Sequence, residues 1–180
     1  MTDTAAKSGG LENLITARIR DIPDYPQPGV VFKDITPLLG DGAAFRTVVD
    51  GLADICGDVD KVAGIEARGF ILAAPVACRL GAGFVPVRKK GKLPAATFSE
   101  DYQLEYGTAT IEVHQDAFAS SDRVLVIDDV LATGGTARAT ADLVQRSGAT
   151  VAGIAVLIEL SFLNGREKLP DLPVTALLTV

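Results

Sequence analysis

The stretch Val124-Leu125-Val126-Ile127-Asp128-Asp129-Val130-Leu131-Ala132-Thr133-Gly134-Gly135-Thr136 decides the fold of this chain. Its four leading apolar residues predict a strand that is buried on both faces, and the two aspartates are expected where that strand ends. The glycine pair then predicts a tight turn. Thr136 is expected to cap a helix over about residues 137–146.

The acidic pair and the glycine turn together predict a binding site for a phosphorylated sugar. Backbone N–H groups at the start of a helix bind anions, and phosphate is the usual one. Open α/β sheets bind their ligands at the carboxyl ends of strands, where Asp128 and Asp129 could accept hydrogen bonds from the hydroxyl groups of a sugar. The alternative is a plain tight corner with solvated aspartates, and the two adjacent acids at a buried strand's end favour the ligand site.

Composition limits the class of protein. The 180 residues suit one domain over residues 11–180, and the net charge of −6, from 17 basic and 23 acidic residues, argues against a nucleic-acid surface. The scattered Cys56, Cys78 and His114 do not form a zinc-type cluster, and the thiols suggest a reducing cytosol. Residues 1–10 are expected to be disordered rather than a secretory signal, and the longest apolar runs are too short to cross a bilayer. We therefore expect a cytoplasmic protein without a membrane partner.

Apolar patterns elsewhere alternate between strand and helix, which predicts a mainly parallel sheet. Residues 21–29 contain three prolines and are expected to form neither helix nor strand. The other expected elements are helices at 11–20, 43–56 (capped by Asp41) and 70–80, strands at 30–35, 62–65, 84–87, 151–160 and 177–178, a half-exposed strand at 110–114, and a turn or short helix at 161–169.

Cations follow two of these strands. Arg68 comes after residues 62–65, and the run Arg88-Lys89-Lys90-Gly91-Lys92 comes directly after residues 84–87. Such a run is usually a solvated face, but in an acidic protein that binds a polyanion it is the expected counter-charge. Residues 93–106 contain few apolar positions and predict a long loop or loose hairpin, the kind of segment from which lids are made.

The stretch 124–136 resembles the phosphoribosyl pyrophosphate (PRPP) signature of the type I phosphoribosyltransferases. Residues 25–38, 66–70, 88–94 and 104–107 also resemble, in order, segments of the adenine phosphoribosyltransferases, so the resemblance covers about residues 14–169. It implies the type I phosphoribosyltransferase fold: a mainly parallel, twisted sheet flanked by helices, with a small N-terminal hood (about 20–37) and a mobile lid loop (about 93–108).

The resemblance also implies a reaction. The family makes AMP and pyrophosphate from adenine and PRPP in purine salvage, usually as a homodimer, with Mg²⁺ carried by PRPP rather than held directly by the protein. The transition state is expected to be oxocarbenium-like, so water must be kept from the sugar. A backbone carbonyl of the hood is expected to select the 6-amino group of adenine.

Residue roles implied by the resemblance fall into four groups. Asp128 and Asp129 bind the ribose hydroxyls, and Ala132, Thr133, Gly134, Gly135 and Thr136 bind the 5′-phosphate. Pyrophosphate is bound by Arg68, Arg88, Lys89 and Lys92. Adenine is bordered by Val30 (through its backbone), Phe32 and Leu160. Glu105 and Tyr106 belong to the lid. The catalytic residues are Glu105, which shuttles a proton, and Arg68, which stabilises the leaving pyrophosphate. The Glu66–Ala67 peptide is expected to be cis or strained, and Lys90 departs from the small or uncharged residue of many members.

Two alternatives remain open. One is a phosphoribosyltransferase for another base, such as xanthine or orotate. The other is a PRPP-sensing regulator that binds DNA and catalyses nothing, although the net charge of −6 argues against a DNA-binding face.

Overall fold

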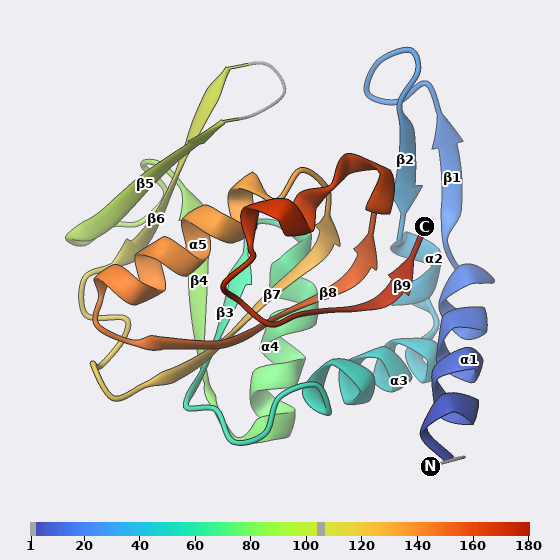
Figure 1. Cartoon of the computed structure of the whole chain (residues 1–180), viewed down its shortest axis with the longest axis horizontal. Coiled ribbons are helices and arrows are strands. Elements are labelled where there is room, and N and C mark those ends of the chain that lie inside the picture. Colours follow the sequence, from blue (N-terminus) through green and yellow to red (C-terminus); the bar gives the residue numbers. More distant parts are fainter. Residues whose placement is uncertain (1–2, 104–106) are drawn as a thin grey trace.

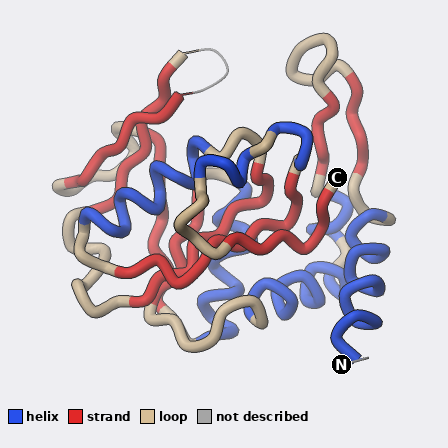
Figure 2. The backbone as a smooth tube through the Cα atoms, in the orientation of Figure 1, coloured by secondary structure: helices blue, strands red, loops and turns tan. Residues whose placement is uncertain are grey.

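The computed structural model describes residues 3–103 and 107–180, with the side chains of residues 3–8 left out. A large sheet of seven strands forms the centre of the described chain (Figures 1 and 2). Its strands are β3 (Lys61–Ile65), β4 (Gly83–Lys89), β5 (Thr97–Gln103), β6 (Thr108–His114), β7 (Arg123–Leu131), β8 (Thr150–Glu159) and β9 (Val174–Thr179). Their order is β5-β6-β4-β3-β7-β8-β9.

Most of this sheet is parallel. Strands β4, β3, β7, β8 and β9 run in one direction, and β6 pairs antiparallel with both β4 and β5. The stretch chosen from the sequence forms β7 at the middle of the parallel part, where it pairs with β3 on one side and β8 on the other. The predicted fold class is therefore confirmed.

Helices cover both faces of the sheet (Figure 1). On one face lie α3 (Gly42–Ala53) and α4 (Arg68–Leu80), and on the other lies α5 (Gly135–Arg146). Residues 124–127 are fully buried. Val124 and Val126 belong to the core under α5, whereas Leu125 and Ile127 belong to the core under α3 and α4. An apolar residue is therefore required at every position of this strand segment, as the continuous run predicts.

The N-terminal hairpin corrects one prediction. Residues 21–23, expected to be irregular, and Arg20, expected to end a helix, form β1 (Arg20–Pro23), which pairs antiparallel with β2 (Val31–Asp34). Proline is tolerated because Pro23 is the last residue of a strand whose other edge is free of a partner strand in the described chain. We call β1–β2 the hood hairpin, since it lies within the segment predicted as the hood.

Three other elements bear on the sequence prediction. Helix α1 (Asp3–Thr16) begins eight residues before the expected start, so residues 3–10 are helical rather than disordered. The alanines at positions 5 and 6 favour a helix, but this segment has no apolar periodicity from which a helix could be predicted. A short helix α2 (Thr36–Gly40) begins at Thr36–Pro37, where proline suits a first turn. The expected cap of α3 is confirmed, because the Asp41 carboxylate accepts hydrogen bonds from the N–H groups of Ala43 and Ala44.

Two hairpins rise on either side of the sheet edge at which β7 and β8 end (Figure 1). One is the hood hairpin, and the other is β5–β6, which realises the predicted loose hairpin with a regular register from Thr97↔His114 to Gln103↔Thr108. Short 3₁₀ turns η1 (Ser161–Leu163) and η2 (Gly165–Lys168) follow β8, as expected for residues 161–169. Among the described residues, no helix is both long and apolar enough to span a membrane.

Candidate active site

A small hollow forms where β7 passes into α5. Its volume is about 70 Å³. It is lined by Asp128, Val130, Leu131, Ala132, Thr133, Gly134, Gly135, Thr136, Ala137 and Val156. All five residues predicted to bind a 5′-phosphate therefore border one cavity, at the N-terminus of a 12-residue helix. Backbone N–H groups at this place are suited to an anion.

The turn itself corrects the predicted helix cap. Helix α5 begins at Gly135, so Thr136 lies inside its first turn and is not the cap. Gly134 takes that place with a left-handed φ of 78°, and its carbonyl accepts from the N–H of Arg138 at 3.0 Å. A side chain at residue 134 would have been disfavoured by this φ, which is why glycine rather than the threonine precedes the helix.

A second glycine, Gly165, closes the hollow from outside. A Cβ on Gly134 would collide with the carbonyl oxygen of Gly165, and a Cβ on Gly165 would collide with the carbonyl oxygen of Ala132. Gly165 is held in place by its neighbour Arg166, whose Nε and Nη2 donate to the buried Glu159 carboxylate at 2.7 Å each. Sequence reasoning placed residues 161–169 in a turn but did not connect Gly165 to the phosphate site; the Asn-Gly turn signal alone gives no partner.

The acidic pair lies inside β7 rather than at its end. Strand β7 continues to Leu131 because it stays paired with β8, but its pairing with β3 stops at Ile127. Asp128 and Asp129 thus follow the last residue of β7 that pairs with β3, and Asp128 lies against the first turn of α4, where a Cβ on Gly69 would come within 2.9 Å of its Oδ1. This is how they reach the ligand side of the sheet although the strand continues.

Arg68, the first residue of α4, contacts this acidic pair. Its Nη2 lies 2.6 Å from Oδ2 of Asp129, whose side chain is almost fully buried. Asp128 is partly buried, and its Oδ1 accepts from the N–H of Asp129 at 2.8 Å. Burial and the negative charge of Asp129 raise the pKa of Asp128 well above its ordinary value. The expectation that Arg68 and the aspartates share one crevice agrees with this geometry.

Arg68 also reaches the hood hairpin. Its Nη1 donates to the carbonyl oxygen of Lys33 at 3.2 Å, and its guanidinium lies 4.7 Å from the centre of the Phe32 ring. One side chain therefore joins β7 to the hood. The Glu66–Ala67 peptide bond, one residue earlier in the chain than the bond to Arg68, is cis, in agreement with the resemblance.

The basic run begins in the last two residues of β4 and continues into the turn that follows the strand. We call residues 88–92 the basic turn. Arg88 Nε donates to Oε2 of Glu66 at 3.2 Å, and the N–H of Lys89 donates to the same oxygen at 3.0 Å. Burial acts to raise the pKa of Glu66, but these hydrogen bonds and the positive charges outweigh it and lower the pKa. The ammonium groups of Lys89, Lys90 and Lys92 are exposed and have no acidic partner among the described side chains.

An apolar cavity of about 510 Å³ lies between the hood hairpin and η1. Its lining residues are Asp21, Gly29, Val30, Val31, Lys33, Leu160, Phe162, Leu163 and Val180. Of the three residues expected to border adenine, Val30 and Leu160 line it. Phe32 does not; its ring packs edge-on against Tyr25, with centroids 5.2 Å apart, and against Arg68. The alternation of side chains along β2 puts Val31 and Lys33 in the cavity instead.

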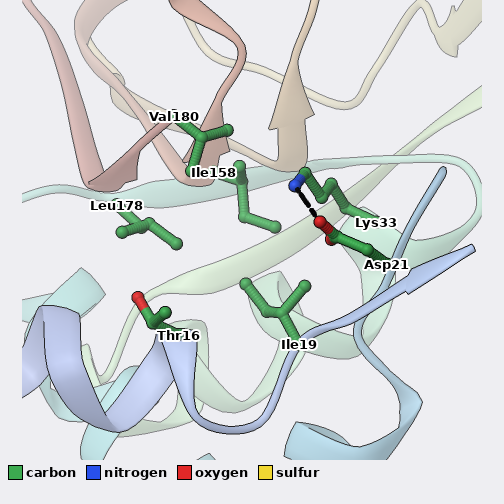
Figure 3. Close-up of a pocket in the computed structure, with 7 residues that line it drawn as sticks. All are labelled: Thr16, Ile19, Asp21, Lys33, Ile158, Leu178 and Val180. Carbon is green, nitrogen blue, oxygen red and sulfur yellow. Dashed lines mark hydrogen bonds and ion pairs between the residues drawn. The ribbon is translucent and has the colours of Figure 1, made fainter. Parts of the chain in front are cut away.

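A smaller cavity of about 130 Å³ continues below the hood hairpin, between α1 and the ends of β8 and β9 (Figure 3). The sticks show the Lys33 ammonium beside Asp21, at 2.8 Å, with Ile19, Ile158 and Leu178 facing the same space. Asp21 and Lys33 line both this cavity and the apolar cavity of about 510 Å³, so the two cavities have this ion pair in common.

Glu105 and Tyr106, the expected lid residues, lie outside the described residues. The hairpin that carries them is described on both sides, and its β5 end lies beside the phosphate hollow. A Cβ on Gly135 would come within 3.1 Å of the Gln103 carbonyl oxygen and 3.4 Å of the Tyr102 ring. The last residues of β5 therefore lie next to the turn that joins β7 to α5.

The chain matches the model of the phosphoribosyl transferase domain over residues 41–175. It is also 63% identical over 175 residues to an adenine phosphoribosyltransferase of Thermobifida fusca, a match that covers 96% of this chain and 99% of the relative. The chain belongs to the adenine phosphoribosyltransferase family. This confirms the resemblance drawn from the five sequence segments.

Solved structures of the family agree with the fold. An adenine phosphoribosyltransferase of Thermoanaerobacter pseudethanolicus is 50% identical, with a TM-score of 0.91 over 94% of this chain and 99% of that one. A yeast adenine phosphoribosyltransferase, solved with adenine and an imino-altritol bisphosphate, is 34% identical, with a TM-score of 0.88 over 96% and 99%. The chain therefore has the architecture of the adenine phosphoribosyltransferases over nearly its whole length.

Proposed function

We propose that this protein catalyses purine salvage, transferring the 5-phosphoribosyl group of PRPP to adenine and releasing AMP and pyrophosphate. The observation that carries the proposal is the combination of the phosphate hollow with the Arg68–Asp129 pair, 2.6 Å apart, at one edge of the sheet. Together they offer an anion site and two carboxylates within consecutive residues. A sugar phosphate has the matching groups, a phosphate and neighbouring hydroxyls.

In the proposed complex the hollow at 132–136 holds the 5′-phosphate through backbone N–H groups and the hydroxyls of Thr133 and Thr136. Asp128 and Asp129 accept hydrogen bonds from the ribose hydroxyls. Such bonds favour the ionised carboxylate, so sugar binding opposes the burial that raises the pKa of Asp128 in the free protein. The sugar is thereby oriented with its anomeric carbon toward the hood.

Negative charge grows on pyrophosphate as the bond to the sugar breaks. We propose that Arg68, Arg88, Lys89 and Lys92 stabilise it, the first from the start of α4 and the others from the basic turn. We propose that Mg²⁺ is carried by the phosphates of PRPP and is not held directly by the protein, since Mg²⁺ is commonly bound through substrate phosphates. When bound, Mg²⁺ would supply further neutralisation of the pyrophosphate charge.

Adenine is proposed to occupy the apolar cavity under the hood hairpin, bordered by Val30 and Leu160 with Phe32 at its Arg68 side. The yeast relative was solved with adenine and a bisphosphate ligand, which supports a base site beside phosphate sites. A hood carbonyl that accepts from the 6-amino group would be left unpaired by a 6-oxopurine. Turnover with adenine should therefore exceed turnover with hypoxanthine or guanine.

Glu105 is proposed to take the proton that adenine loses as N9 attacks, and Tyr106 to close over the site with the lid (residues 93–108). A positioned general base contributes about 10²- to 10⁴-fold in rate. Glu105→Ala should therefore reduce AMP formation by about that factor while leaving the Kd for PRPP within about twofold. An equal loss of PRPP binding would contradict this role.

A homodimer and a cytoplasmic location are also proposed, both on the resemblance to the family. Sedimentation velocity tests the first: a single species at the monomer mass of 18.8 kDa would contradict it. The single domain over residues 11–180, with its hood and lid, remains part of the same proposal.

One assay tests the function itself. The protein is incubated with PRPP, Mg²⁺ and adenine, hypoxanthine, guanine, xanthine or orotate in turn, and nucleotide is measured. We expect nucleotide, as AMP, with adenine and with none of the other four bases. Nucleotide from another base would favour the enzyme alternative, and PRPP binding without any nucleotide would favour the regulator.

A further inference from the structure

The backbone of the basic turn is held by a complete set of hydrogen bonds. Each amide N–H of residues 89–92 has an acceptor, and two of the four acceptors are buried or partly buried carboxylates. In chain order the bonds are Lys89 to Glu66 Oε2 at 3.0 Å, Lys90 to the Thr110 carbonyl at 3.1 Å, Gly91 to Glu112 Oε2 at 3.0 Å, and Lys92 to the Lys89 carbonyl at 3.3 Å.

Glu112 is the acceptor that no role explains so far. It stands on β6 directly opposite Arg88 of β4, and only 6% of it is exposed. Its Oε2 accepts from the N–H of Gly91, and its Oε1 accepts from the Ser99 hydroxyl of β5 at 3.3 Å. Within the described residues it forms no ion pair, so both of its oxygens serve the turn and the hairpin.

A buried carboxylate beside a cationic turn has an electrostatic cost. Burial of a charge is unfavourable, and a negative charge near the basic turn weakens the attraction of that turn for an anion. Against this stands a charge-assisted hydrogen bond to Gly91, whose left-handed φ of 79° marks the point where the turn reverses. Glu112 can therefore favour anion binding only through the shape of the turn, because its charge opposes anion binding.

We propose that Glu112 is a positioning residue for pyrophosphate: by accepting from Gly91 it fixes the basic turn so that Lys89 and Lys92 point toward the leaving group. Its bond to Ser99 ties the same turn to β5, the strand that leads into the lid. The inference rests on the proposed pyrophosphate role of residues 88–92, and it adds a residue that touches no substrate.

The test compares variants of Glu112 and its neighbours by calorimetric titration with magnesium pyrophosphate and, separately, with AMP. In Glu112→Ala the Gly91 N–H loses its acceptor, and the Kd for pyrophosphate should rise about tenfold, the usual effect of losing one charged hydrogen bond. The Kd for AMP, which binds at the hollow and the hood, should stay within about twofold.

Glu112→Gln is the matched control, because it has the same shape without the charge. Its amide oxygen can accept from Gly91 and its NH₂ can donate to Ser99, so the Kd for pyrophosphate should stay within about twofold. Ser99→Ala removes the other bond only and should also stay within about twofold. If Glu112→Ala does not fold, Glu112→Asp, which keeps the charge but is too short for both bonds, should weaken pyrophosphate binding instead.

The inference is overturned by unchanged pyrophosphate affinity in Glu112→Ala, or in Glu112→Asp where that variant replaces it. It is equally overturned if Glu112→Gln loses as much affinity as Glu112→Ala, or if AMP affinity falls in parallel. The variant Lys92→Ala distinguishes a failure of this inference from a failure of the proposed function. If Lys92→Ala weakens pyrophosphate binding and Glu112→Ala does not, only the inference fails; a parent that forms no AMP and binds no pyrophosphate contradicts both.

Discussion

The hollow at residues 132–136, which we call the phosphate hollow, and the basic turn are the two proposed anion sites, and they are built in opposite ways. The hollow is lined by backbone, hydroxyls and small side chains, and its shape depends on the contact between Gly134 and Gly165. The basic turn is exposed and presents three lysine ammonium groups from a backbone held by Glu66 and Glu112. One site should recognise its anion by fit and the other by charge, so substitutions and salt should act on them differently.

Gly134→Ala should have the largest effect. The added Cβ collides with the Gly165 carbonyl, and the left-handed φ of 78° is strained for any other residue. We expect kcat/KM to fall by about 10²-fold, because a displacement near 1 Å at a binding group has that effect. The free energy of unfolding should fall by about 2–4 kcal/mol from strain and overpacking. Steady-state kinetics and urea denaturation measure the two changes.

Gly81→Ala is the control for that substitution. Gly81 has a similar φ of 67° at the end of α4, but a Cβ there meets nothing within 4 Å. It should lose only about 1–2 kcal/mol and keep normal kinetics. If the two variants behave alike, the contact between the glycines has no part in phosphate binding.

Arg68→Ala should come next, since Arg68 joins the acidic pair of β7 to the hood hairpin. It leaves the buried Asp129 unpaired and breaks the contacts with Lys33 and Phe32. Loss of charged hydrogen bonds of this kind should lower kcat/KM by about 30-fold, with effects on both PRPP and adenine. Arg79→Ala, which breaks an exposed ion pair with Asp50, serves as the control and should leave kcat/KM unchanged. Equal kinetics in the two variants would remove Arg68 from the site.

Lys92→Ala should have a smaller effect that depends on salt. Removal of one exposed cation should raise KM for PRPP by about fivefold at low ionic strength, and the difference should shrink as salt screens the charge. Gly134→Ala should show no such dependence on salt, because its effect is steric. A salt-independent effect of Lys92→Ala would mean that the basic turn, too, binds by fit.

Asp128→Asn should have the smallest effect, on stability. Because the folded-state pKa of Asp128 is raised, the native protein binds this proton more tightly than the unfolded chain does. The stabilising contribution is full below the ordinary value of 3.8 and is lost as the pH rises through the folded-state pKa. This substitution should therefore raise the Tm of the ligand-free protein at pH 7 but not near pH ~3.5. The control is Asp116→Asn, because Asp116 is exposed. An identical change of Tm in that variant would contradict the assignment of the pH-dependent destabilisation to Asp128.

Local patterns were enough to predict the centre of the fold. The apolar run at residues 124–127 identified the central buried strand, and Asp41 identified the start of α3, because burial and helix capping act within a few residues. The five residues predicted to bind phosphate border one hollow for the same reason. Their chemistry is carried by one continuous stretch of backbone, so no knowledge of distant residues was needed.

Features that depend on distant partners were not predictable. Gly165 lies against Gly134, next to the ion pair of Arg166 with Glu159, and nothing near residue 165 in the sequence indicates that contact. Glu112 sits in a segment whose alternation indicates a half-exposed strand, yet β4 and β5 bury it from both sides. The contact of Phe32 with Arg68 was not predictable either, because the residues are far apart in the sequence and meet only where β2 approaches the start of α4.

The contact between Gly134 and Gly165 also sets when the site can exist during synthesis. The outer wall of the hollow comes from Gly165, which follows α5 and β8 in the chain, and Arg166, its neighbour, also donates to the Val174 carbonyl at 2.7 Å. A nascent chain from which residue 165 has not yet emerged lacks that wall, although β7 and α5 have already left the ribosome. The protein therefore completes the hollow only after residue 165 has emerged, so a ligand of the hollow cannot guide the earlier folding of β7 and α5.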